Sequence, residues 1–145
     1  MDTTRGGEAG DGSGTEPGSG TLLVVDAANV VGSVPDGWWR DRHAAAERLR
    51  DSLAAEGGQS AVPGPVEVVL VVEGAARGVE PVPGVQVVPA PGSGDDLIAA
   101  LAADAGRAGR PCVVVTADRG LRARVTAAGA RCTGPRSVRR RLTDG

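Results

Sequence analysis

The stretch TLLVVD at Thr21–Asp26 places four apolar residues in a row directly before an acid. Three further apolar runs have the same character, at Val66–Glu73, Val85–Pro89 and Cys112–Thr116, and a weaker one covers Ala130–Thr133. Apolar runs without polar alternation are typical of strands in a parallel sheet that helices cover on both faces. We therefore predict a central parallel sheet of about five strands.

Helical spacing of apolar residues between these runs predicts the covering layers. The residues expected to share a face in three successive helices are Trp38, Ala45, Leu49 and Leu53, then Leu97, Leu101 and Ala105, then Leu121, Val125 and Ala128. We expect Gly106 and Gly129 at helix C-termini, and Ser93 with Asp96 as a capping box. The link Gly74–Gly84 is too short for a good crossover helix. The alternation of strands and helices predicts a three-layer α/β sandwich.

The length of 145 residues suits one domain. Residues 1–20 contain too few apolar side chains to offset the entropy of ordering, so we expect a disordered tail before a domain at 21–145. No apolar run reaches the roughly 20 residues that span a bilayer, and the N-terminus lacks an apolar signal segment. Cys112 and Cys132 have no CxxC spacing and are expected to be buried free thiols. These features favour a cytoplasmic protein with no membrane partner.

The net charge of −2 is unevenly distributed along the chain. Eight arginines and a single acid lie between Arg119 and the C-terminus, whereas residues 1–20 carry four acids and one arginine. A basic C-terminal quarter is compatible with a polyanionic partner such as RNA.

Acidic residues end or follow the apolar runs. Asp26 closes the first run and Glu73 the second, Asp118 follows the fourth, and Asp95 and Asp96 open the helix after the third. In open parallel sheets, ligands bind beyond the carboxyl ends of the strands, where the strand order reverses. With the order 3-2-1-4-5, Asp26 and Asp118 would face each other there. Carboxylates this close repel one another unless a cation lies among them, and oxygen ligands select Mg²⁺ or Mn²⁺.

Each acid also has a purely structural interpretation. Asp95, Asp96 and Asp118 lie at expected helix N-termini, where a carboxylate gains about 0.3–1 kcal/mol from the helix dipole without any metal. Asp26 ends an apolar strand instead, and its coincidence with the other acids favours a metal site. Asn29 is expected either to form the turn or to orient Asp26 or a metal-bound water.

Other polar residues near the expected edge have two equally good interpretations. Glu73 is either a member of the site or a surface acid. Arg77, Arg119 and Arg122 either contact phosphates or serve as ordinary surface residues.

Three motifs resemble the NYN branch of the PIN-like nucleases. They are VDAANVVG at 25–32, GDDLI at 94–98 and VVTADR at 114–119. Within this branch the chain is most similar to YacP-type proteins, some of which are ribosome-associated endoribonucleases, and WWRDR at 38–42 adds a similarity to an actinobacterial subgroup. The resemblance covers about residues 21–135. It implies a PIN-like, Rossmann-like fold and Mg²⁺- or Mn²⁺-dependent cleavage of RNA, with Asp26, Asp95 and Asp118 as the acids and Asn29 beside them. Asp96 would share or replace the role of Asp95.

The sequence therefore predicts a metal-dependent ribonuclease whose metal ligands are Asp26, Asp95, Asp96 and Asp118. RNA is the expected partner, and ribosome association is a further expectation from the resemblance. Two alternatives stay open, namely a non-catalytic RNA- or ribosome-binding module and a nucleotide pyrophosphohydrolase.

Overall fold

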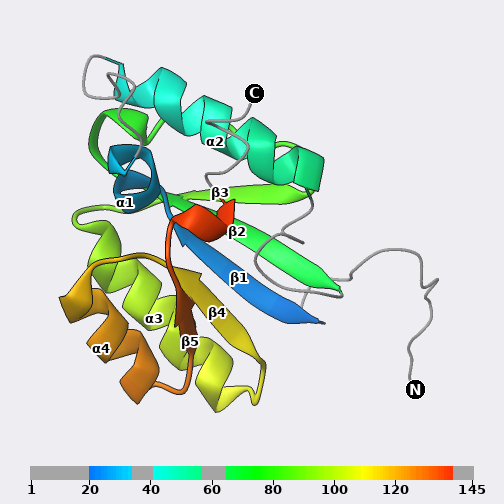
Figure 1. Cartoon of the computed structure of the whole chain (residues 1–145), viewed down its shortest axis with the longest axis vertical. Coiled ribbons are helices and arrows are strands. Elements are labelled where there is room, and N and C mark those ends of the chain that lie inside the picture. Colours follow the sequence, from blue (N-terminus) through cyan, green and yellow to red (C-terminus); the bar gives the residue numbers. More distant parts are fainter. Residues whose placement is uncertain (1–19, 34–40, 57–64, 139–145) are drawn as a thin grey trace.

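In a computed structural model, which describes residues 20–33, 41–56 and 65–138, five strands form one sheet with the order β3-β2-β1-β4-β5 (Figure 1). Their bounds are Thr21–Asp26 for β1, Val66–Val72 for β2, Val85–Pro89 for β3, Cys112–Val115 for β4 and Arg131–Thr133 for β5. Neighbouring strands pair in parallel throughout this sheet. The predicted strands and their order are confirmed. The expected tail, the Trp38–Trp39 pair and Arg139–Arg141 lie outside the described residues.

Helices cover both faces of the sheet (Figure 1). The helices α1 (Ala27–Gly32) and α2 (Arg42–Glu56) lie on one face, and α3 (Gly94–Arg107) and α4 (Arg119–Ala127) lie on the other. The link after β2 contains only the short 3₁₀ helix η3 (Gly74–Ala76). The predicted three-layer α/β fold is therefore confirmed. Among the described residues, no helix is long and apolar enough to cross a membrane.

The central strand β1 explains why the apolar runs are continuous. Leu23 and Val25 pack into the core under α1 and α2, whereas Leu22 and Val24 pack into the core under α3 and α4. All four side chains are buried. Because successive residues of a strand point to opposite faces, a strand covered on both sides needs apolar residues at every position.

The inner face of α3 differs from the prediction. Ile98 and Ala102 are buried together with Ala105, whereas Leu97 and Leu101 are only partly buried at the flank of the same core. The prediction is therefore confirmed for Ala105, whereas at Leu97 and Leu101 the buried position is the next residue along the helix. The helix begins at Gly94, against Val71 of β2, which turns the residues four and eight positions later toward the sheet.

Two glycines expected at helix ends have different positions. Gly129 follows the C-cap of α4 with a φ of +98°, as predicted. Gly106 instead lies inside α3, which ends at Arg107, and Gly109 supplies the positive φ after it. A Cβ at position 106 would lie 2.5 Å from the carbonyl oxygen of Ala128. Gly106 thus permits close approach of α3 to the end of α4 rather than ending a helix.

Replacing Ile98 with alanine tests which face of α3 packs on the sheet. Because Ile98 is fully buried, Ile98→Ala is expected to lower the free energy of unfolding by about 2–5 kcal/mol. Leu97→Ala removes a side chain that keeps part of its surface in water, and its cost is expected to be roughly half as large or less. Urea unfolding measures both, and a larger loss for Leu97→Ala would contradict the observed face.

Candidate functional site

Asp26 is the buried acid at the carboxyl end of the central strand. Its carboxylate accepts a hydrogen bond from Thr116 Oγ1 at 2.9 Å on Oδ2 and a longer one from the N–H of Asn29 at 3.4 Å on Oδ1. The second bond makes Asp26 the N-cap of α1. Burial raises the pKa of Asp26, the two hydrogen bonds lower it, and the charges of Asp95 and Glu73 raise it again. Asp26 therefore lies within the field of two other acids.

Thr116 connects Asp26 to the next acid along the edge. It is fully buried directly after β4, and its hydroxyl donates to Asp26 while accepting the N–H of Asp118 at 3.1 Å. Asp118 in turn begins α4 by accepting the N–H of Leu121 at 2.9 Å. Sequence reasoning missed Thr116. The available signal was a hydroxyl residue that ends an apolar run two positions before an acid.

Asn29 and Arg122 hold the loop between β4 and α4. Asn29 Oδ1 accepts the N–H of Ala117 at 2.9 Å, which joins α1 to this loop. Arg122 Nε donates to the carbonyl oxygen of Thr116 at 2.8 Å. Both side chains thus have structural partners at the site. The Asn29 side chain bonds the loop, and the backbone N–H of Asn29 donates to Asp26. Arg77 and Arg119, the other two arginines expected near the edge, are exposed.

The remaining acids come from two further segments. Glu73, directly after β2, accepts the N–H of Gly94 on Oε1 at 2.6 Å and so joins the end of β2 to the start of α3. Ser93 caps α3 by accepting the N–H of Asp95 at 3.1 Å. Asp96 is exposed and forms an ion pair with Arg124 at 3.1 Å. The expected capping box is wrong in its second half, because Asp96 pairs with α4 instead of the cap residue.

Burial and neighbouring charges both disfavour the ionised form of Asp95. Burial raises its pKa first, and the charges of Asp118 and Glu73 raise it further, whereas Arg124 lowers it. We name the four residues Asp26, Glu73, Asp95 and Asp118 the acidic edge. Electrostatic interactions link Asp95 to each of the other three members.

The acidic edge has the donor chemistry of a site for a hard divalent cation. It offers carboxylate oxygens, the ligands that Mg²⁺ and Mn²⁺ prefer, and a cation would relieve the repulsion that raises the pKa of Asp95. Over the described ranges, no three or more His, Cys, Asp or Glu side chains already lie in positions to ligate one ion together. The edge thus fits a cation by its chemistry, without a preformed cage.

The parallel strand order, with helices on both faces and acids after the carboxyl ends of the strands, defines a three-layer α/β protein. The fold is that of Rae1 (YacP) from Bacillus subtilis, with a TM-score of 0.63, 22% sequence identity, and coverage of 84% of this chain and 73% of Rae1. The W164L mutant of Rae1 gives the same TM-score at 20% identity, with 84% and 74% covered. Neither a family model nor a curated protein matches the sequence. The predicted likeness to YacP-type proteins is confirmed at the level of the fold.

Removing the charge of Asp95 is expected to stabilise the protein near neutral pH. Because the folded state raises the pKa of Asp95, folding favours its protonated form, and that stability is lost as the pH rises through the folded pKa. Asp95→Asn should raise the free energy of unfolding at pH 7 by about 0.2–0.5 kcal/mol, the usual size of a like-charge repulsion on a helix. The gain should vanish as the pH falls below the ordinary value of 3.8.

Urea unfolding at several pH values measures this effect, with Asp96→Asn as the matched control from the same helical turn. Asp96 pairs with Arg124, so its loss should bring no gain in stability. An equal gain from both substitutions would show that the helix terminus, and not the acidic edge, disfavours the charge.

Proposed function

We propose that this protein is a metal-dependent ribonuclease that hydrolyses RNA phosphodiester bonds at the acidic edge. The observation that carries the proposal is the convergence of four carboxylates from four separate segments on the carboxyl end of a parallel sheet. Ligands of open α/β sheets bind at this end, where the strand order reverses. The fold shared with Rae1 (YacP) supports the same class of activity.

Asp95 lies at the start of α3, where the helix dipole favours a negative charge, but burial and the charges of Asp118 and Glu73 raise its pKa all the same. Asp118 caps α4 and Glu73 bonds the backbone of α3, so each of these acids has a structural role. No described residue donates a hydrogen bond to the Asp95 carboxylate, and burial and the neighbouring acids disfavour its charge more than Arg124 favours it. Groups whose pKa is perturbed by burial and by specific charges concentrate at functional sites. Asp95 is therefore the residue that most favours a functional interpretation of the edge.

Asp26, Asp95 and Asp118 would hold a Mg²⁺ or Mn²⁺ ion, with Glu73 beside them. When bound, such an ion polarises a phosphoryl oxygen, lowers the pKa of water and neutralises the leaving oxygen. Asp96 is directed to Arg124, so we assign it to the periphery of the site. Asn29 and Thr116 position the loop and the carboxylate of Asp26, respectively.

In the proposed reaction, water attacks phosphorus in line with the bond to the 3′ oxygen. The new P–O bond leaves a 5′-phosphate, and the P–O3′ bond breaks to leave a 3′-hydroxyl that takes up a proton. Asp118 is exposed and Asp95 is partly exposed, so both can orient the water and accept its proton. Arg77 and Arg119, both exposed, are assigned to the phosphates on either side.

A hollow between the C-terminal end of α1 and the segments that follow β4 and β5 gives the RNA backbone a path away from the edge. It is lined by Ser33, Ala117, Thr133 and Arg136, among others. Ala117 lies next to Asp118 in the chain, so this hollow begins where the acidic edge ends. The Arg136 side chain offers a bidentate donor to a phosphate there.

Incubation of the purified protein with single-stranded RNA and Mn²⁺ tests the proposal. We expect cleavage that a chelator stops, and a loss of about a hundredfold or more in rate for Asp26→Asn and Asp118→Asn, because several kcal/mol of charge stabilisation are removed. Asparagine is itself a good N-cap residue, so helices α4 and α1 should still begin at the same positions. Asp104→Asn, an exposed acid of α3 outside the edge, is the matched control and should keep full activity.

Full activity of Asp26→Asn and Asp118→Asn would overturn the proposal. RNA binding without cleavage, weakening steeply with salt and indifferent to chelator, would instead indicate an RNA- or ribosome-binding module. Release of pyrophosphate or orthophosphate from nucleoside triphosphates, with RNA left intact, would indicate a pyrophosphohydrolase.

Mn²⁺ binding is expected to stabilise the folded protein independently of any reaction. At a free concentration 100 times the dissociation constant, one ion that binds only the folded state adds about 2.7 kcal/mol to the free energy of unfolding. Asp95→Asn and Asp118→Asn should lose most of the resulting increase in Tm, and Asp104→Asn should keep it. Calorimetric scans with Mn²⁺ and with chelator give the comparison, and equal increases in all variants would place the ion elsewhere.

A further inference from the structure

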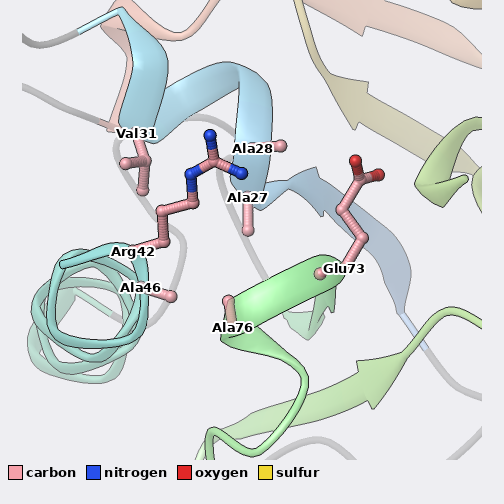
Figure 2. A pocket seen from close by; sticks show the side chains of 8 residues that line it. Ala27, Ala28, Val31, Arg42, Ala46, Glu73 and Ala76 are labelled. Atoms are coloured by element: carbon pink, nitrogen blue, oxygen red, sulfur yellow. The ribbon is translucent and has the colours of Figure 1, made fainter. Parts of the chain in front are cut away.

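A small pocket lies beside the acidic edge, between α1, α2 and η3 (Figure 2). Its volume is about 220 Å³. Drug-sized ligands occupy about 300–1,000 Å³, so this space suits a ligand no larger than one ring system or two fused rings. Of the described lining residues, five have small aliphatic side chains, namely Ala27, Ala28, Val31, Ala46 and Ala76. Such walls suit a flat, largely apolar ligand.

Two of the described residues at the pocket wall carry charged side chains. Figure 2 shows the Arg42 side chain reaching from α2 toward α1, and Glu73 on the other side of Ala28. The planar guanidinium of an arginine can stack on an aromatic ring. The Glu73 carboxylate accepts the N–H of Gly94 on Oε1, which leaves Oε2 to accept a hydrogen bond from a ligand. The pocket thus has a stacking plane at Arg42 and, beyond Ala28 and directed away from Arg42, a hydrogen-bond acceptor at its rim (Figure 2).

The pocket is continuous with the acidic edge. Glu73 belongs to both, and Ala27 directly follows Asp26 in the chain. A group held in the pocket therefore adjoins the edge at Glu73 and at the start of α1. In a nucleic acid, the base is the flat ring system attached to the phosphate backbone.

We propose that this pocket binds one nucleobase of the RNA next to the phosphodiester at the acidic edge. The proposal rests on the ribonuclease function proposed above and adds a determinant of base preference to it. Because a carboxylate only accepts hydrogen bonds, Glu73 favours bases that carry an exocyclic amino group, namely adenine, cytosine and guanine. The one donor of the uracil base, its ring N3–H, lies between two carbonyl oxygens that a carboxylate repels. Arg42 stacks on the base. The alanine side chains of the wall limit the thickness and the outline of the base that fits.

Methyl NMR of alanine-labelled protein tests the pocket without requiring any cleavage. AMP, CMP, GMP and UMP are titrated in turn. We expect ring-current shifts at Ala28, Ala46 and Ala76, and none at Ala100 or Ala123 on the opposite layer. One hydrogen bond to Glu73 should make AMP, CMP and GMP bind about three- to tenfold more tightly than UMP.

Two pairs of variants separate the pocket from the rest of the surface. Ala28 is exposed at the pocket wall, so Ala28→Leu fills space without overpacking the core, and it should weaken AMP binding about tenfold or more. Ala100→Leu, at an exposed position of α3, is the matched control and should bind AMP like the natural protein. Arg42→Lys keeps the charge and should weaken all four nucleotides, whereas Glu73→Gln supplies an amide donor and should remove the disadvantage of UMP.

The outcomes distinguish this proposal from the proposed function. Shifts confined to the pocket alanines and abolished by Ala28→Leu support the base pocket even if RNA is never cleaved. Cleavage of RNA with shifts absent from these alanines, or with the same affinity in Ala28→Leu, overturns the base pocket and leaves the ribonuclease standing. Equal affinity for UMP and AMP in the natural protein overturns the assigned role of Glu73.

Discussion

The buried hydrogen bond from Thr116 Oγ1 to Asp26 Oδ2 fixes the geometry on which the carboxyl edge depends. It joins the ends of β1 and β4, the two strands between which the order of the sheet reverses. The same hydroxyl accepts the N–H of Asp118, so one side chain sets the relative positions of two acids. A buried carboxylate without such a partner would be strongly disfavoured, because burial penalises its charge. Asp26 can remain beside the core because Thr116 and Asn29 both donate to it.

Around this bond the two helical layers contribute different chemistry. The layer of α3 and α4 presents Asp95 and Asp118 at helix starts, where backbone N–H groups favour negative charge. The layer of α1 and α2 presents small apolar side chains and Arg42 around the pocket. Glu73 lies between them and bonds the start of α3. Acids and pocket therefore meet at one end of the sheet, in an arrangement that suits a ligand with a charged backbone and a flat ring.

The fold and the location of the candidate site could be predicted from the sequence, because both depend on local composition. Strands covered on both faces must be apolar at every position. TLLVVD and the similar runs can therefore be recognised in the sequence as strands of this kind. An acid that directly follows such a run must lie at the carboxyl end of the strand. Asp26 and Asp118 were therefore predictable as members of one edge, and their common placement needed only the strand order.

What the tertiary structure alone decided concerns contacts between segments far apart in the chain. The partnership of Thr116 with Asp26, the bond from Gly94 to Glu73 and the pocket at Ala28 depend on how closely separate loops approach, which no local pattern encodes. The same holds for Gly106, whose missing side chain matters only because the end of α4 lies against it. Sequence by itself determined the strands and the acids at their ends, since burial acts on each segment separately. Packing decided which side chains meet, since that depends on all the segments at once.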